Sequence, residues 1–94
     1  MIVRILGEGQ FVVDDAHAAL LNSLDSGLER AVEAGDEAGF RSALTSLVSE
    51  VRTIGDRLPD DSLEPSDAVV PDESSSLEEV RTMLADTSEG LIPG

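Results

Sequence analysis

The sequence predicts an α+β domain that is mainly helical, in which an N-terminal β-hairpin packs on an antiparallel pair of helices and a short third helix follows. Three observations predict this fold. A β-branched apolar segment opens the chain, two later segments carry apolar residues at helical spacing, and an acidic, proline-rich segment precedes a last short helical pattern. We expect one domain over residues 1–94, because a chain of 94 residues has little surface to bury in a second core.

The hairpin is predicted over residues 1–13. Its two apolar segments, 1–6 and 10–13, are separated by Gly7-Glu8-Gly9, where glycine adopts a positive φ without strain in a tight turn. A two-stranded hairpin is only marginally stable alone in water, so we expect this one to lie against the helices.

Two long helices are predicted over residues 15–34 and 37–54. In both segments the apolar positions are spaced by 4, 3, 4 and 3 residues, which places them on one face of a helix. Gly35 offers a left-handed end to the first helix and Asp36 an N-cap to the second, so the helices run antiparallel. The apolar seam is formed by His17, Leu21, Leu24, Leu28 and Ala31, and by Phe40, Leu44, Leu47, Val51 and Ile54. Either these seams pack on each other, or one stays partly open for a partner's helix.

Residues 55–75 are predicted to form an acidic, proline-rich connector that crosses the surface. From residue 56 to residue 76 the chain holds seven acids, one arginine and three of its four prolines, which gives a formal charge of −6. Ala68-Val69-Val70 is the apolar exception, and it forms either a short edge strand or an extended clip docked on the helices.

The third helix is predicted over residues 76–85, with a tail over residues 86–94. Ser75 with Glu78, or Ser76 with Glu79, has the spacing of a capping box. In the tail, Leu91 and Ile92 either pack into the core or wait for a partner.

No catalytic, metal or cofactor site is predicted. The chain has no cysteine, and its single histidine, His17, cannot form a zinc site alone. Ser66-Asp67 lacks a base to activate the serine, and Gly7-Glu8-Gly9 lacks the third glycine and the lysine of a phosphate loop. The acids of the connector lack the ligand alternation and central glycine of an EF-hand. We therefore expect a protein that is not an enzyme and holds no cofactor.

The charge of the chain points to protein partners. Twenty acidic residues face six arginines and no lysine, and the formal net charge of −14 opposes direct binding to nucleic acid or to anionic lipid. The acidity reflects either adaptation of the host or attraction to a basic partner. No segment is apolar enough for a signal peptide or a membrane span, so we expect a cytoplasmic location.

The candidate partner-binding residues fall into three groups: acids of the connector, acids on the outer face of the first long helix, and the apolar pair of the tail. They are Asp56, Asp60, Asp61, Glu64 and Asp67, then Asp25 and Glu29, and finally Leu91 and Ile92.

Taken in order, five stretches resemble the PspA-associated PspAA family, small companions of phage-shock protein A. They are residues 1–11, Leu58-Pro59-Asp60-Asp61, Pro65-Ser66-Asp67, residues 77–81 and residues 90–94. The resemblance implies a role beside PspA, a long coiled-coil protein that assembles on the inner face of the cytoplasmic membrane under envelope stress. Membrane association would then be indirect, through this partner, and the family supplies no active site to carry over.

Two hypotheses of function follow. The first is an adaptor that binds a PspA-type coiled coil and modulates its assembly. The second is a regulatory domain that acts on a different protein partner, such as a transcriptional regulator. A winged-helix module would need a basic recognition helix, and the sequence has none.

Overall fold

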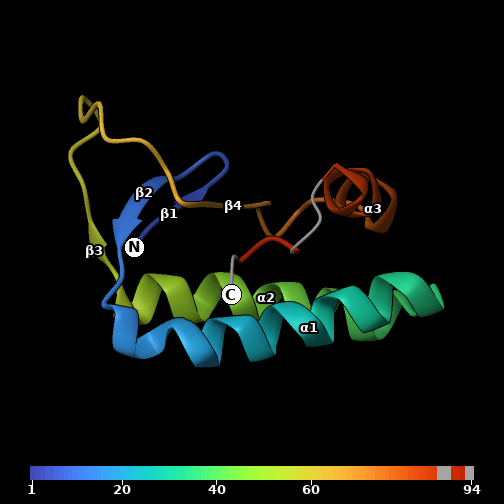
Figure 1. Ribbon diagram of the computed structural model, residues 1–94. Coiled ribbons are helices and arrows are strands. Elements are labelled where there is room, and N and C mark those ends of the chain that lie inside the picture. Colours follow the sequence, from blue (N-terminus) through green and yellow to red (C-terminus); the bar gives the residue numbers. More distant parts are fainter. Residues whose placement is uncertain (87–89, 93–94) are drawn as a thin grey trace.

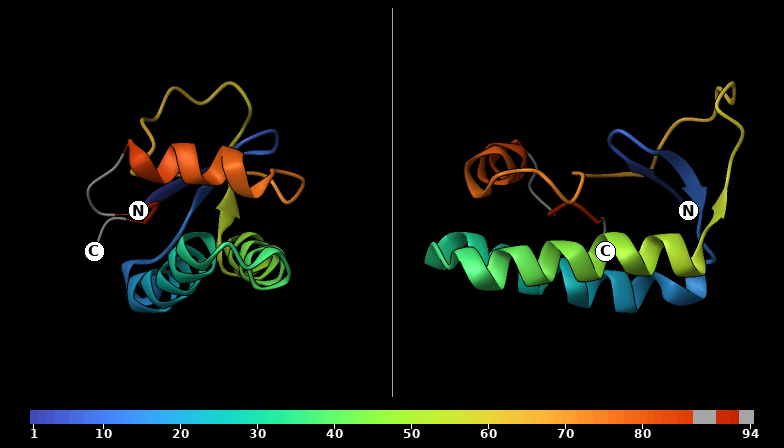
Figure 2. Two further views of the ribbon diagram at one scale, coloured as in Figure 1. Left: turned by 90° about the vertical axis from the view of Figure 1, so that its right-hand side faces the viewer. Right: turned by 180° about the vertical axis from the view of Figure 1, so that it is seen from behind.

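The computed structural model of the protein describes residues 1–86 and 90–92. A four-stranded sheet and a short helix, α3, lie on the same side of a layer made by two long antiparallel helices, α1 and α2 (Figure 1). Seen along the long helices, α3 crosses above them (Figure 2). The predicted α+β class, with its hairpin, helical pair and third helix, is confirmed.

The hairpin consists of β1 (Ile2–Ile5) and β2 (Gly9–Val12), paired antiparallel with Val3 opposite Phe11. The turn between them has a positive φ at Gly7 (85°) and at Gly9 (129°), the conformation for which glycine is needed there. Alternate side chains of β1 point into the core, so Val3 and Ile5 are fully buried while Arg4 is exposed. The predicted hairpin therefore exists, with its apolar face against the helices.

The connector adds one strand to each side of this hairpin. β3 (Asp56–Arg57) pairs antiparallel with β2, and β4 (Ala68–Val70) pairs parallel with β1, which gives the strand order β3-β2-β1-β4. Of the two alternatives for β4, the edge strand is confirmed. Asp56–Arg57 lie on the surface, as predicted for the connector, but they also form a strand that was not predicted and that covers an otherwise unpaired edge of β2.

The helical pair follows the predicted boundaries closely. A 3₁₀ turn (Asp15–His17) precedes α1 (Ala18–Ala34), and α2 (Glu37–Ile54) begins after Gly35, whose φ is 67°, and Asp36, whose side chain accepts a hydrogen bond from the Gly39 N–H at 3.0 Å. His17 was expected on the buried seam, but it ends the 3₁₀ turn and is only half-buried. The buried seam of the pair comprises Leu21, Asp25, Leu28 and Val32 of α1 and Phe40, Leu44, Leu47, Val48 and Val51 of α2.

The last helix, α3 (Leu77–Ala85), begins with a complete capping box. The Ser76 hydroxyl accepts a hydrogen bond from the Glu79 N–H at 3.1 Å, and the Glu79 carboxylate accepts one from the Ser76 N–H at 3.2 Å. The second of the two predicted frames is thus the one used. Leu91 and Ile92 are buried in the core, which confirms the packed alternative for the tail. The other tail positions 87–89 and 93–94 lie outside the described residues.

Candidate functional site

The nine candidate residues divide into two places in the fold. The acids of the connector lie in β3 and in the loop over residues 58–67 that joins β3 to β4, which we call the connector loop. The acids of α1 and the apolar pair of the tail lie together near α3. Figure 1 shows the connector loop projecting at one end of the molecule and α3 at the other, so the two groups form separate surfaces.

The base of the connector loop is held by side chains of the hairpin. Gln10 is buried, and its Nε2 donates hydrogen bonds to the Glu64 carbonyl at 2.6 Å and to the Ser66 hydroxyl at 2.9 Å. The Asp67 carboxylate accepts a hydrogen bond from the Ile2 N–H at 2.7 Å. The strand residues thereby fix where the loop leaves and rejoins the sheet, while the acids of the loop stay exposed.

Arg57 reduces the negative charge at one point of this surface. Its guanidinium donates to the Glu8 carbonyl at 2.6 Å and to Asp60 at 3.3 Å. Asp56, Asp61 and Glu64 are exposed, and within residues 1–86 and 90–92 their carboxylates take part in no ion pair. β3 and the connector loop therefore present exposed carboxylates that a basic partner can contact.

Leu63 stands at the same loop and was not among the candidates. Its exposed fraction is 97%, against 37–44% for the four other large exposed hydrophobic residues. Single exposed apolar residues are common, but one held almost fully in water between acidic neighbours combines an apolar anchor with a charged rim. The signal was present in the sequence, as the one large apolar residue between Pro59 and Pro65.

Asp25 is not on the outer face of α1, and that expectation is wrong. Its exposed fraction is 3%, and its Oδ2 accepts hydrogen bonds from the backbone N–H groups of Leu91 at 3.0 Å and Ile92 at 3.1 Å. Burial raises the pKa of Asp25, the Ile92 N–H lowers it, the charge of Glu29 raises it, and the Leu91 N–H lowers it, with a net rise. Asp25 holds the tail instead of facing a partner.

The tail approaches α1 so closely that only glycine fits at residue 90. Gly90 has a φ of 82°, and a Cβ atom there would overlap the carboxylates of Glu29 and Asp25. The next two residues fill the core, so Leu91 and Ile92 are not exposed contacts in this structure. Of this second group only Glu29, which is partly exposed, remains accessible.

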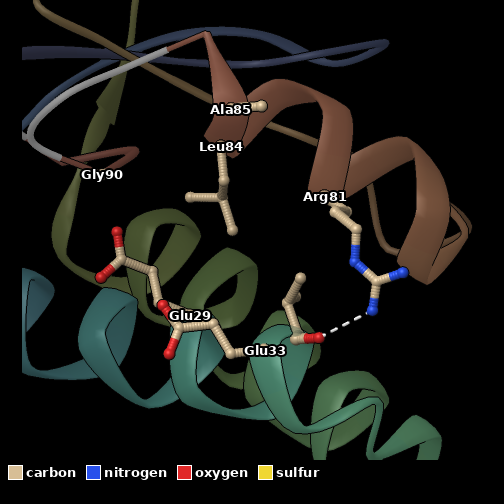
Figure 3. A pocket seen from close by; sticks show the side chains of 7 residues that line it. Glu29, Glu33, Arg81, Leu84, Ala85 and Gly90 are labelled. Atoms are coloured by element: carbon tan, nitrogen blue, oxygen red, sulfur yellow. Dashed lines mark hydrogen bonds between the residues drawn. The ribbon is translucent and has the colours of Figure 1, made fainter.

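A groove lies beside the tail, between α1 and α3. Its volume is about 460 Å³, and Figure 3 shows residues of both helices lining it. Arg81 crosses the space between the helices: its Nη2 donates to the Val32 carbonyl at 3.0 Å, and its Nη1 donates to Glu78 at 2.6 Å. The full lining is Glu29, Val32, Glu33, Arg81, Leu84, Ala85 and Gly90.

Among the described residues there is neither a metal-binding cluster nor a membrane-spanning helix. No group of three or more histidine, aspartate or glutamate side chains in this part of the chain is arranged to hold a metal ion. No helix among the same residues has the length and apolar character that crossing a membrane requires.

The fold and these surfaces define a small, acidic, mainly helical α+β domain with a projecting acidic loop and a groove between two helices. Over residues 1–94 the chain matches the PspAA family, described as PspA-Associated protein, and it belongs to that family. The family predicted from the sequence is thus confirmed. Comparison with curated proteins and with solved structures found no match.

Proposed function

We propose that the protein is a non-catalytic adaptor, which binds a PspA-type coiled-coil protein and modulates its assembly in the envelope stress response. The observation that carries this proposal is the family match, which spans residues 1–94 and names association with PspA. The same match favours PspA over a transcriptional regulator as the partner. In this proposal the protein works in the cytoplasm and reaches the membrane only through its partner.

The connector loop is the surface that we propose for the first contact. Its exposed carboxylates attract a basic surface over a distance and raise the rate of encounter. Leu63 then supplies the apolar contact, because removing its nearly fully exposed side chain from water on binding is favourable. A basic stretch of a coiled coil, with an apolar depression between its charged side chains, has the matching chemistry.

Co-elution of the two purified proteins tests the proposal. We expect the protein and the PspA-type protein of its own organism to elute together in size-exclusion chromatography at micromolar concentrations and moderate salt. Separate elution under these conditions would overturn direct binding. The control for unspecific electrostatic attraction is the same protein mixed with an unrelated basic protein, with which it should not co-elute.

The contribution of the loop is tested by Leu63→Ser. Because this side chain makes no core contact, we expect folding to be unchanged and the affinity for the PspA-type protein to fall about tenfold, or about 1.4 kcal/mol in binding free energy. Isothermal titration calorimetry measures this change. Leu20→Ser, at an exposed position of α1, is the matched control and should bind as the unchanged protein does. Equal affinities of the two variants would exclude Leu63 as the contact.

A further inference from the structure

The groove between α1 and α3 combines apolar walls with carboxylates on one rim. Val32, Leu84 and Ala85 supply the aliphatic surface, and Glu29 and Glu33, one helical turn apart on α1, supply the acids. The volume of about 460 Å³ is within the range of about 300–1,000 Å³ that is usual for ligand clefts. This groove is therefore shaped for an occupant with an apolar stem and a positive end.

The one cation that lines the groove is already engaged. Arg81 donates to the Val32 carbonyl and forms an ion pair with Glu78, on its own helix. No ion pair within residues 1–86 and 90–92 involves Glu29 or Glu33. Figure 3 shows these two carboxylates at one end of the groove and Arg81 at the other. The α1 end of the groove therefore carries negative charge that no described side chain balances.

A third acid of α1, Asp25, lies next to this pair in the interior of the molecule. It lies one helical turn before Glu29, is buried, and its pKa is raised in part by the charge of Glu29. A cation between Glu29 and Glu33 would relieve this repulsion, because an opposite charge nearby favours the ionised form of each carboxylate. An anionic occupant would face Glu29 and Glu33 at the rim, so the chemistry of this end of the groove selects a cation.

We propose that this groove receives an arginine side chain from a basic helix of the protein partner. The aliphatic stem packs against Leu84 and Ala85, and the guanidinium lies between Glu29 and Glu33. Arginine fits better than lysine, because its planar donors bridge two carboxylates and its head is less strongly hydrated. The inference rests on the proposed adaptor function and adds to it the side chain of the partner that is recognised.

The first test removes the two charges without changing the shape of the groove. We expect the double variant Glu29→Gln/Glu33→Gln to bind the PspA-type protein at least about tenfold more weakly in isothermal titration calorimetry. The control, Glu37→Gln/Glu50→Gln, removes the same charge from α2, which does not line the groove, and should lose less than about twofold. No loss in the first variant, or an equal loss in both, would overturn the proposal.

The second test fills the groove without changing its charge. Ala85 is exposed at the end of α3 and lines the groove, so Ala85→Phe obstructs it while leaving the core intact. We expect weaker binding than for Ala38→Phe, an exposed position of α2 away from the groove. Circular dichroism of both variants establishes that they fold. Equal binding by the two folded variants would count against occupation of the groove.

A small probe separates failure of this inference from failure of the adaptor function. N-acetyl-arginine amide is titrated into the ¹⁵N-labelled protein, and we expect saturable amide shifts confined to residues 29–33 and 81–85, which Glu29→Gln/Glu33→Gln abolishes. If the PspA-type protein does not bind, such shifts would still support a guanidinium site, and their absence would overturn it. If the PspA-type protein binds, the affinities of Glu29→Gln/Glu33→Gln and Ala85→Phe decide whether the groove takes part in binding.

Discussion

At the scale of single residues, a buried carboxylate holds the C-terminal segment in place. Asp25 Oδ2 accepts hydrogen bonds from two backbone N–H groups, those of Leu91 and Ile92, which would otherwise be buried without partners. The other oxygen, Oδ1, has no partner among the residues described. The link between α1 and the tail therefore runs through one side chain, whose ionised form is penalised by burial.

We predict that Asp25→Asn flattens the pH dependence of stability. The pKa of Asp25 is raised above 3.8, mainly by burial, so between 3.8 and that raised pKa the folded protein binds more protons than the unfolded chain. The free energy of unfolding contributed by Asp25 is therefore present below pH 3.8 and is lost as the pH rises through the raised pKa. The amide oxygen of asparagine still accepts both hydrogen bonds without a charge, whereas its NH2 group, at the place of the unpaired Oδ1, lowers stability equally at every pH. Urea denaturation at a series of pH values measures both effects.

A matched control isolates this contribution from those of the other acids. Asp61→Asn removes the same charge from an exposed position and should keep the pH slope of the unchanged protein. The prediction fails if Asp25→Asn and Asp61→Asn give the same slope.

For Asp25 the sequence holds two opposing signals, and only one of them predicts burial. Its position, four residues after Leu21 and three before Leu28, is on the apolar face of the helix. Its charge nevertheless pointed to the surface, because aspartate is almost never fully buried without partners. The partners are backbone N–H groups 66 and 67 residues away, and no local pattern reveals them. For Leu63, in contrast, local sequence is enough, because its acidic neighbours indicate that the side chain is exposed.

At the scale of elements, α3 depends on its first turn. A helix of nine residues is marginal alone in water, and this one is held by the capping box and by the buried side chains of Leu77 and Val80. The capping box also fixes where α3 begins, and hence where Leu84 and Ala85 meet the groove.

We predict that Ser76→Ala lowers the free energy of unfolding by about 1 kcal/mol, because the Glu79 N–H loses its acceptor. Urea denaturation measures the loss, and hydrogen exchange should show it as faster exchange in α3 than in α2. Ser46→Ala, at an exposed position in α2, is the control and should be neutral or slightly stabilising. A loss in the control as large as in Ser76→Ala would contradict the capping argument.

The helices and the hairpin were predictable because their signals are local, whereas the strands that the connector adds to the hairpin were not predictable in full. Spacing along the chain and the Gly35-Asp36 pair sufficed to place α2 at its observed ends. β3 has two residues and both are exposed, so it has no apolar pattern to detect. The apolar β4 was recognised as extended, but its parallel register with β1 depends on contacts such as Asp67 to Ile2, across 65 residues. Local sequence cannot reveal such a pairing.

At the scale of the whole molecule, like charges oppose the folded state. The net charge is −14, and ion pairs in the described part of the chain involve only five acidic residues. They are Glu8, Asp15, Asp60, Glu73 and Glu78. All five pairs involve exposed or partly exposed side chains, where an ion pair contributes little to stability. Repulsion among the remaining acids is therefore a property of the entire surface.

We predict that salt stabilises the protein and that most of the gain comes at low concentration. From about 0.01 M to about 0.1 M salt the Debye length falls from about 30 Å to about 10 Å, which screens repulsion across the molecule. Thermal unfolding followed by circular dichroism in increasing NaCl should show Tm rising steeply over this range and slowly beyond it. A flat or falling Tm would show that self-repulsion is unimportant.

The same salt series separates the two explanations of the acidity. Attraction to a basic partner weakens as salt screens it, so a functional role predicts that binding falls over the range in which stability rises. Adaptation of the host alone predicts higher stability in salt with no change in affinity. Binding of the PspA-type protein, measured at each NaCl concentration, distinguishes them.

The parallel pairing of β1 with β4 bears on how the protein is synthesised. A ribosome delivers the chain from its N-terminus, so α1 and α2 can pair once residue 54 has emerged, but β1 must wait for residues 68–70. The Asp25 contact waits longer, until residues 91 and 92 have been made. During translation β1 therefore pairs with β2 alone, and its other edge stays unpaired until β4 has emerged. We expect the nascent hairpin, and not the helical pair, to be the part that chaperones protect.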